Sequence, residues 1–154
     1  MAVRNIPLSP AVITLAPEMN LKQALGFMLE RDINHLPVLD ERGYYGLLDI
    51  NDILRELIPA SARVYGGLND LRFAGDADRL LISHMNDLAD KAVGDMARRD
   101  LPVLRDDCPL LEAALLLSRQ AAPMPVLDGD GRLLGMLSRR ALLRHLVKAA
   151  GSQA

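Results

Sequence analysis

The 154-residue sequence is poor in aromatic residues, which make up 3% of it, and it contains no tryptophan. Half of the chain is apolar by composition, so its core must be packed mainly from leucine, valine, isoleucine, methionine and alanine. Cys108 is the one cysteine. No intramolecular disulfide can therefore form, and a lone cysteine fits a reducing compartment.

Charge and hydropathy argue against two classes of partner. The formal net charge of −2 offers no basic surface of the kind that nucleic acid requires. The apolar runs fall short of the ~20 residues that span a bilayer. Pro7 and Pro10 stand where a secretory signal would be continuously apolar. We therefore expect a soluble cytoplasmic protein, with no nucleic-acid or membrane partner, that forms one compact domain or two half-domains sharing a core.

The sequence contains two copies of one pattern. Residues 37–40, Pro-Val-Leu-Asp, recur as residues 125–128, and each copy is followed by a glycine before two apolar residues, Gly46 or Gly135. The match extends upstream, because the apolar spacing of residues 21–25 recurs over residues 110–114. Residues 3–6 also faintly resemble residues 93–96. These matches divide the chain into a first repeat over 3–58, a connector over 59–92 and a second repeat over 93–147.

Each repeat predicts the element order β-α-β-β-α. Short strands are expected at residues 13–15 and 103–104, and hairpins from residues 36–39 with 47–48 and from 124–127 with 136–137. Asn20 with Gln23 resembles a capping box at the start of the first helix, whose apolar residues 21, 24, 25, 28 and 29 predict one buried face. In the second repeat, Asp107 precedes Pro109, a residue tolerated in a first helical turn. The closing helices are expected to bury residues 53, 54 and 57 in one repeat and 142, 143 and 146 in the other.

The connector has no counterpart in the repeats. Residues 59–75 include Gly66-Gly67 and are typical of a loop, whereas residues 76–92 carry apolar residues at helical spacing. We expect a helix there that joins the two halves and packs on one of them. It serves either as a structural connector or as an element that faces a partner or gates a site.

This pattern resembles the CBS domain, and two copies in tandem resemble a Bateman module. The resemblance rests on the Leu-x-x-Ala helix, the h-P-V-h-D strand, the glycine-bearing hairpin and the motif G-h-h-[S/T]-x-x-D, where h is an apolar residue. It implies an α+β fold in which two β-α-β-β-α repeats pack with pseudo-two-fold symmetry beside a helical connector. It also implies two clefts between the repeats that hold adenosine-containing ligands such as AMP, ATP or S-adenosylmethionine. Pairing into homodimers is a further implication.

The same motif suggests which residues would contact such a ligand. The start of the closing helix offers backbone N–H groups and the positive end of its dipole to an anion, and a nearby carboxylate can accept both ribose hydroxyls. Backbone of the h-P-V strand and of the short strand before it would flank the adenine. The candidate ligand-binding residues are Val12, His35, Leu36, Pro37, Asp49, Asp52, Pro102, Met124, Pro125, Ser138, Arg139 and Arg140.

The two copies differ in the charges at these positions. The first keeps the ribose-type carboxylate at Asp52 but places Asp49 where a phosphate would lie, and two unit charges ~4 Å apart repel by roughly 4 kcal/mol at an effective dielectric of 20. The second has the neutral cap Ser138 and several arginines, but Ala141 replaces the carboxylate. We therefore expect unequal clefts, the first for a nucleoside without phosphate or a cationic one, the second for a phosphate.

Nothing in the sequence favours an enzyme. The histidines at 35, 84 and 145 lie on separate expected elements and show no metal-ligand spacing. Cys108 stands at an expected helix start, where the pKa of a thiol can fall, but it has no nearby histidine. Ser138 lacks a nucleophile-elbow motif, and no phosphate-cradling glycine-rich loop is present.

Two hypotheses follow from these observations. In the first, the chain is a regulatory sensor that binds an adenosine-type ligand, requires no cofactor or metal, and signals to an unidentified protein. In the second, its clefts are empty and it is an interaction module that acts only in homodimer or partner assembly. Under the second hypothesis, Asp49 and Asp52 simply cap a helix, Arg139 and Arg140 are solvated or contact the dimer partner, and His35 is packed or solvated.

Overall fold

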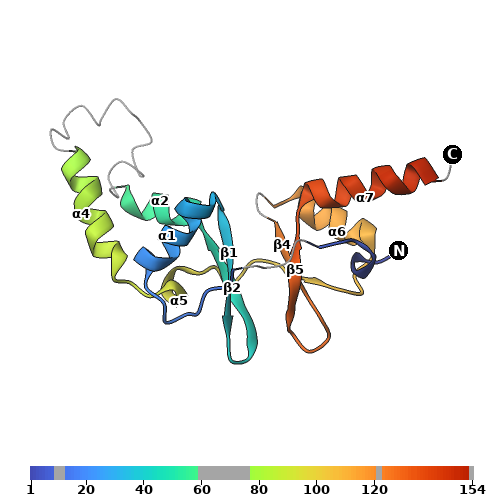
Figure 1. The fold of residues 1–154 in the computed structure, drawn as a ribbon, viewed down its shortest axis with the longest axis horizontal. Coiled ribbons are helices and arrows are strands. Elements are labelled where there is room, and N and C mark those ends of the chain that lie inside the picture. The colour runs from blue at the N-terminus through green and yellow to red at the C-terminus, as the bar shows by residue number, and fades with distance from the viewer. Residues whose placement is uncertain (9–12, 59–76, 121–122, 153–154) are drawn as a thin grey trace.

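The computed structural model describes residues 1–8, 13–58, 77–120 and 123–152. Val12 and the loop expected over 59–75 lie outside these described residues. The fold is α+β and consists of two halves that lie side by side in Figure 1. The predicted fold class is confirmed, and the described part of the connector includes the expected helix.

The elements follow the predicted order within each half. The first half contains α1 (Leu21–Arg31), β1 (His35–Asp40), β2 (Gly43–Asp49) and α2 (Ile50–Leu57). The second contains β3 (Leu104–Arg105), α6 (Leu110–Ser118), β4 (Met124–Leu127), β5 (Leu133–Leu137) and α7 (Arg139–Ser152). A 3-10 helix, η1 (Val3–Asn5), and the short helix α5 (Val93–Met96) begin the two matched stretches, and α4 (Ala77–Ala89) lies between the halves in sequence.

The two hairpins have equivalent pairing. Strands β1 and β2 are antiparallel with His35 opposite Asp49, and β4 and β5 are antiparallel with Met124 opposite Leu137. Both ladders shift register at the same place in the repeat, directly after Val38 and directly after Val126. The strand expected at residues 13–15 is reduced to a single bridge, whereas the one expected at 103–104 is found one residue later, as β3. Leu15 makes an isolated parallel bridge to Val38 in one half, whereas β3 pairs in parallel with β4 in the other.

Local sequence accounts for the start of α1. The side chain of Asn20 accepts a hydrogen bond from the Gln23 N–H at 2.8 Å, which satisfies one of the free donors at a helix N-terminus. Helix α6 begins differently, because Pro109 precedes its first residue and provides no side-chain cap. The cap predicted at Asn20 is therefore confirmed, but among the described residues the Gln23 side chain does not return the second hydrogen bond of a capping box. Pro109 lies one residue outside the helical turn in which it was expected.

Some leucines predicted to be buried are exposed. On the closing helices Ile53 and Leu142 are buried, but their neighbours Leu54 and Leu143 are 56% and 60% exposed. Successive residues on an α-helix point ~100° apart, so each pair cannot share one face toward a sheet. Leu29 is exposed for the same reason, since it follows the buried Met28. Leu146 shares a face with Leu142 but is 39% exposed, because the buried part of α7 is confined to its first turn. On these helices the apolar residues therefore cover a wider arc than the face that is buried.

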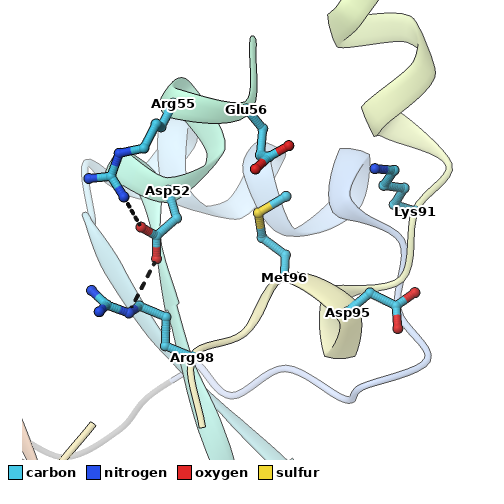
Figure 2. Close-up of a pocket in the computed structure, with 7 residues that line it drawn as sticks. All are labelled: Asp52, Arg55, Glu56, Lys91, Asp95, Met96 and Arg98. Atoms are coloured by element: carbon cyan, nitrogen blue, oxygen red, sulfur yellow. Dashed lines mark hydrogen bonds and ion pairs between the residues drawn. The ribbon is translucent and has the colours of Figure 1, made fainter. Parts of the chain in front are cut away.

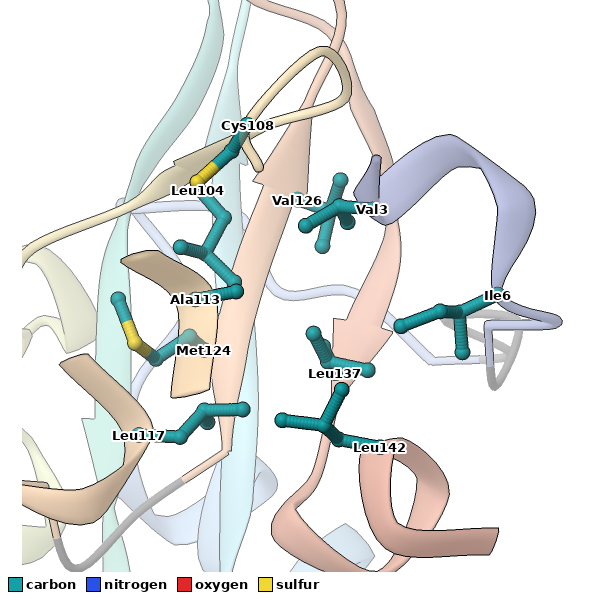
Figure 3. Close-up of a cluster of buried hydrophobic side chains, with 10 residues drawn as sticks. All are labelled: Val3, Ile6, Leu104, Cys108, Ala113, Leu117, Met124, Val126, Leu137 and Leu142. Carbon is teal, nitrogen blue, oxygen red and sulfur yellow. The ribbon is translucent and has the colours of Figure 1, made fainter. Parts of the chain in front are cut away.

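The residues that begin each matched stretch pack on the opposite half. Val3 and Ile6 belong to the buried cluster of the second half, where Val3 lies beside Val126 and Leu137 in Figure 3. Its N–H donates to the carbonyl of Cys108 at 2.9 Å. Conversely, Val93 is fully buried in the cluster of the first half and donates to the carbonyl of Met19 at 2.7 Å. Neither half completes its core without this exchanged segment.

The chain that returns from α5 passes against β2. Arg98 and Leu47 exchange two backbone hydrogen bonds, of 2.9 and 3.0 Å, so residue 98 extends the hairpin sheet. This contact depends on Gly46, because a Cβ at that position would lie 2.7 Å from the Arg98 carbonyl oxygen. The hairpin turns also meet, since the Tyr44 N–H lies 3.4 Å from the Gly131 carbonyl oxygen.

We predict that Gly46→Ala lowers the free energy of unfolding by about 1–3 kcal/mol, because the added methyl would collide with backbone that cannot yield cheaply. Gly26→Ala is the matched control. Gly26 lies in α1, where an added methyl would have no neighbouring atom within 4 Å, so this change should stabilise the protein by about 0.5–1 kcal/mol. Urea unfolding monitored by circular dichroism measures both, and equal effects of the two substitutions would contradict the prediction.

Candidate functional site

The start of α2 carries two predicted site residues in direct contact. Asp49 is the N-cap residue, and its Oδ1 accepts a hydrogen bond from the Asn51 N–H at 2.8 Å. Its Oδ2 lies 3.5 Å from Nε2 of His35, which strand pairing places directly opposite. Both side chains are less than one-fifth exposed, at 19% for His35 and 18% for Asp49. A protonated His35 would offset the negative charge that the sequence places at this cap.

Asp52, one turn into the same helix, has one carboxylate oxygen without a hydrogen bond. Its Oδ1 accepts from Nη1 of Arg55 at 3.2 Å. Its Oδ2 is buried and has no hydrogen-bond partner in the described part of the chain, although Nε of Arg98 lies 3.9 Å away. Buried polar atoms are nearly always paired, and an orphaned one is costly. The free oxygen is therefore a position where a hydroxyl donor would be stabilised.

Asp52 borders a pocket of about 410 Å³. Figure 2 shows α2 on one side of this space and the segment around α5 on the other. The lining residues are Asp52, Arg55, Glu56, Lys91, Asp95, Met96 and Arg98. They include three cationic and three anionic side chains, so the pocket is polar and close to neutral as a whole. Its lining comes from the first repeat and from the segment that leads into the second.

The other predicted site residues do not line this pocket. Leu36 and Pro37 are buried in β1, and Met124 and Pro125 are buried in β4. Pro102 is half-buried in the segment before β3. The structure thus brings His35 to Asp49 and places Asp52 at the pocket, but it does not gather the strand residues around the same space.

The start of α7 differs from the start of α2. Ser138 caps α7 by accepting a hydrogen bond from the Ala141 N–H at 3.1 Å, as a neutral cap should. Arg139 and Arg140 are exposed, and neither forms an ion pair within the described residues. Ala141 stands where Asp52 stands in the first repeat, and it packs against the core of the second half.

The segments that begin the two repeats, residues 3–8 and 93–98, also differ in charge at one matched position. Aligning Val3 with Val93 places Leu8 at the position of Arg98. Leu8 packs against the core of the second half together with Ala141. Both members of the Asp52–Arg98 ion pair are therefore replaced by apolar residues in the other repeat.

Several pocket residues have no motif in the sequence. Arg55 follows Asp52 by three residues, a spacing at which helix side chains meet, and this signal could have found it. Arg98 and Lys91 give no comparable signal. They reach the pocket only because the end of the connector and the start of the second repeat pack on the first half, a long-range consequence of the fold.

Outside the pocket, burial raises the pKa values of Cys108 and Tyr44. Burial raises the pKa of the Cys108 thiol, and the neighbouring carboxylates of Glu112 and Asp107 raise it further. The expected fall in its pKa is therefore wrong, because burial and adjacent negative charge outweigh the helix start. Burial also raises the pKa of Tyr44 to about 12, and its hydroxyl has no hydrogen-bond partner in the described regions.

The comparisons with known proteins identify the class. The family model of the CBS domain matches residues 3–59 and 93–148, and this chain belongs to that family as a tandem pair. It is 31% identical over 136 residues to the chloroplastic CBS domain-containing protein CBSX2 of Arabidopsis thaliana, a match that covers 83% of this chain and 56% of CBSX2. The chain thus spans about half the length of that relative. A CBS domain-containing protein of Dictyostelium discoideum is 28% identical, covering 92% of this chain and 88% of the relative.

Solved structures agree with this assignment. The crystal structure of CBSX2 from Arabidopsis thaliana matches with a TM-score of 0.74 and 24% identity, over 97% of this chain and 96% of that chain. CBSX2 in complex with AMP matches with a TM-score of 0.68 and 25% identity, over 97% and 98% of the two chains. Within the described part of the protein, no helix is long and apolar enough to cross a membrane, and no cluster of three metal-ligating side chains is found.

We predict that Asp49→Ala costs about 1 kcal/mol of stability, whereas Asp49→Ser costs less than about half of that. Serine is the residue that the second repeat uses at this cap, and it can still accept the Asn51 N–H. Chemical denaturation of the two variants measures the difference. A similar loss in both would show that the ion pair with His35, rather than the cap, is what stabilises the start of α2.

Proposed function

We propose that this protein is a regulatory module that binds an adenosine-containing ligand in the Asp52 pocket. The observation that carries the proposal is the buried Oδ2 of Asp52, which has no hydrogen-bond partner among the described residues and borders a pocket of about 410 Å³. A ribose hydroxyl is a hydrogen-bond donor that would satisfy this oxygen. The volume lies within the range of small-molecule sites.

The family relation supports the choice of ligand. CBSX2, which is similar to this chain over nearly all of its described fold, has been crystallised with AMP. We take AMP, ATP and S-adenosylmethionine as the candidate ligands. Leu36, Pro37 and the Asp49–His35 pair do not line this pocket, so we propose that they support the hairpin and the start of α2 beside it rather than contact the ligand.

The origin of the pocket lining suggests how binding is signalled. Asp52 and Arg55 belong to the first repeat, whereas Asp95 and Arg98 belong to the segment that leads into the second. A ligand that contacts both groups favours the arrangement in which they face one another, and a protein that recognises this arrangement would be regulated. We propose no catalytic step and no required cofactor.

We propose a different role for the second repeat. Ser138, Arg139 and Arg140 offer a neutral cap and exposed cations, which suit a phosphate. Pro102, Met124 and Pro125 would provide the flanking backbone. Without a ribose-type carboxylate at Ala141, this site would select nucleosides less well than the Asp52 pocket.

We predict that AMP raises the thermal midpoint of the wild-type protein, because a ligand at 100 times its dissociation constant adds ~2.7 kcal/mol of stability. Asp52→Asn should weaken binding about tenfold or more, since the charge-assisted hydrogen bonds to ribose are lost. Asp87→Asn, an equal charge change at an exposed position of α4, is the control and should bind as the wild type does. Calorimetric titration with AMP, ATP, adenosine and S-adenosylmethionine measures the affinities.

A flat response of the wild-type protein to all four compounds would contradict the ligand-binding proposal. Equal loss of affinity in the Asp52→Asn and Asp87→Asn variants would place the ligand elsewhere. The flat response would favour the second candidate function, an interaction module.

One observation favours assembly as a second function. Helix α4 packs on both α1 and α2 at the helical face of the first half, although Leu29 and Leu54 remain exposed there. The equivalent face of the second half exposes Leu111, Leu143 and Val147, which are 83%, 60% and 71% exposed. Apolar residues gathered on one face mark an interaction surface. We propose that this α6–α7 face pairs with its copy in a homodimer.

Leu143→Glu should convert that dimer to a monomer, because it buries a charge at the centre of an apolar contact. Leu29→Glu is the matched control, since Leu29 is 66% exposed on α1 in the other half and should leave the dimer intact. Light scattering with size-exclusion chromatography reports the mass. A monomeric wild-type protein, or a monomer produced by both variants, would contradict an interface confined to α6 and α7.

A further inference from the structure

Arg98 is held at the pocket by its backbone, whereas its side chain is partly exposed and makes only long contacts. Its N–H and carbonyl both bond to Leu47 of β2, at 2.9 and 3.0 Å. Gly46 allows this close approach of the two segments. The Arg98 side chain is 43% exposed and projects toward Asp52 in Figure 2. A guanidinium that is held at its base and partly exposed at its end has room to turn toward a bound anion.

The guanidinium of Arg98 is only weakly engaged by the protein. Its Nε lies 3.9 Å from Oδ2 of Asp52 and 4.0 Å from Oδ1 of Asp100, distances too long for hydrogen bonds. No hydrogen bond from this side chain is found within the described residues. By contrast, Arg55 already donates to Oδ1 of Asp52 at 3.2 Å. The terminal nitrogens of Arg98 are therefore available to a ligand.

The negative charge that was expected to repel a phosphate is partly compensated. Asp49 does not line the pocket, and its two oxygens face the Asn51 N–H and the His35 ring. The lining itself contributes three cations, Arg55, Lys91 and Arg98, against three carboxylates. Arginine presents a planar fork of donors that matches phosphate oxygens in pairs, so Arg98 is the lining residue best suited to a phosphate.

The second repeat provides an internal comparison. There, Leu8 and Ala141 stand at the positions of Arg98 and Asp52, and both pack into the core. Carboxylate and arginine are therefore present together in one half and absent together in the other, although they lie 46 positions apart in the sequence. This pairing fits two groups that serve one ligand, the carboxylate for its ribose and the arginine for its phosphate.

We propose that Arg98 is the specificity-determining residue of the Asp52 pocket, selecting a nucleoside monophosphate over the unphosphorylated nucleoside. The inference rests on the proposed function and deepens it. Asp52 binds the sugar and is indifferent to the phosphate, while Arg98 turns from its long contacts to Asp52 and Asp100 onto the phosphate oxygens. The pocket therefore selects a ligand that carries a phosphate. The charge of Asp49 in the sequence predicted the opposite, a nucleoside without phosphate.

The test is calorimetric titration of the full-length chain with AMP, adenosine and S-adenosylmethionine. The wild type should bind AMP about tenfold or more tightly than adenosine, the effect of a charge-assisted hydrogen-bond pair. Arg98→Gln should abolish this preference by weakening AMP about tenfold while leaving adenosine unchanged, and Arg98→Lys should restore part of it. Arg99→Gln is the control, because its guanidinium lies 4.0 Å over the Tyr45 ring and outside the pocket lining.

The outcomes separate the two proposals. Equal affinity of the wild type for AMP and adenosine, or equal weakening of both ligands by Arg98→Gln, would overturn the role of Arg98 while leaving the Asp52 site intact. A loss of AMP preference in Arg99→Gln as large as in Arg98→Gln would overturn it as well. Binding of none of the three compounds would overturn the proposed function together with this inference. Thermal midpoints of the free variants confirm that each is folded.

Discussion

The structure depends on an exchange between two halves that otherwise have separate cores. The segment that begins each repeat packs into the core of the opposite half. Val3 and Ile6 complete the second core, and Val93 completes the first. Burying one such side chain contributes about 1.5–3 kcal/mol, a large share of the stability of a small domain. Because the segment that contains Val93 must lie on the first half, residues 91–98 are brought beside α2. The pocket is a consequence of this exchange and would not exist in a repeat that folded alone.

Duplication followed by divergence explains why the halves have one fold but different chemistry. Backbone features recur, including the register shift after Val38 and Val126 and the capped closing helix. The side chains around them do not, since the ion pair of Asp52 is replaced by apolar residues that fill the second core. The packing of α4 on α1 and α2 adds to the asymmetry. One half thus keeps a polar pocket, and the other keeps an open apolar face.

Local pattern predicted most of the elements, because strands, turns and caps depend on neighbouring residues. The Pro-Val-Leu-Asp strands, the hairpin glycines and the Asn20 cap all lie where they were expected. The site was only partly predictable. Asp52 was found from its motif, but Arg98 was not, because its position depends on a contact between distant segments. The burial of Leu54 and Leu143 was predicted wrongly, since a run of apolar residues does not show where a helix face ends.

The central claim is that a ligand binds where the exchanged segment faces Asp52. A crystal structure of the protein grown with AMP tests it most directly. We predict electron density for AMP in the pocket between α2 and residues 95–98, with a ribose hydroxyl on Oδ2 of Asp52. Density for AMP only at the start of α7, or an empty pocket at saturating AMP, would contradict the account.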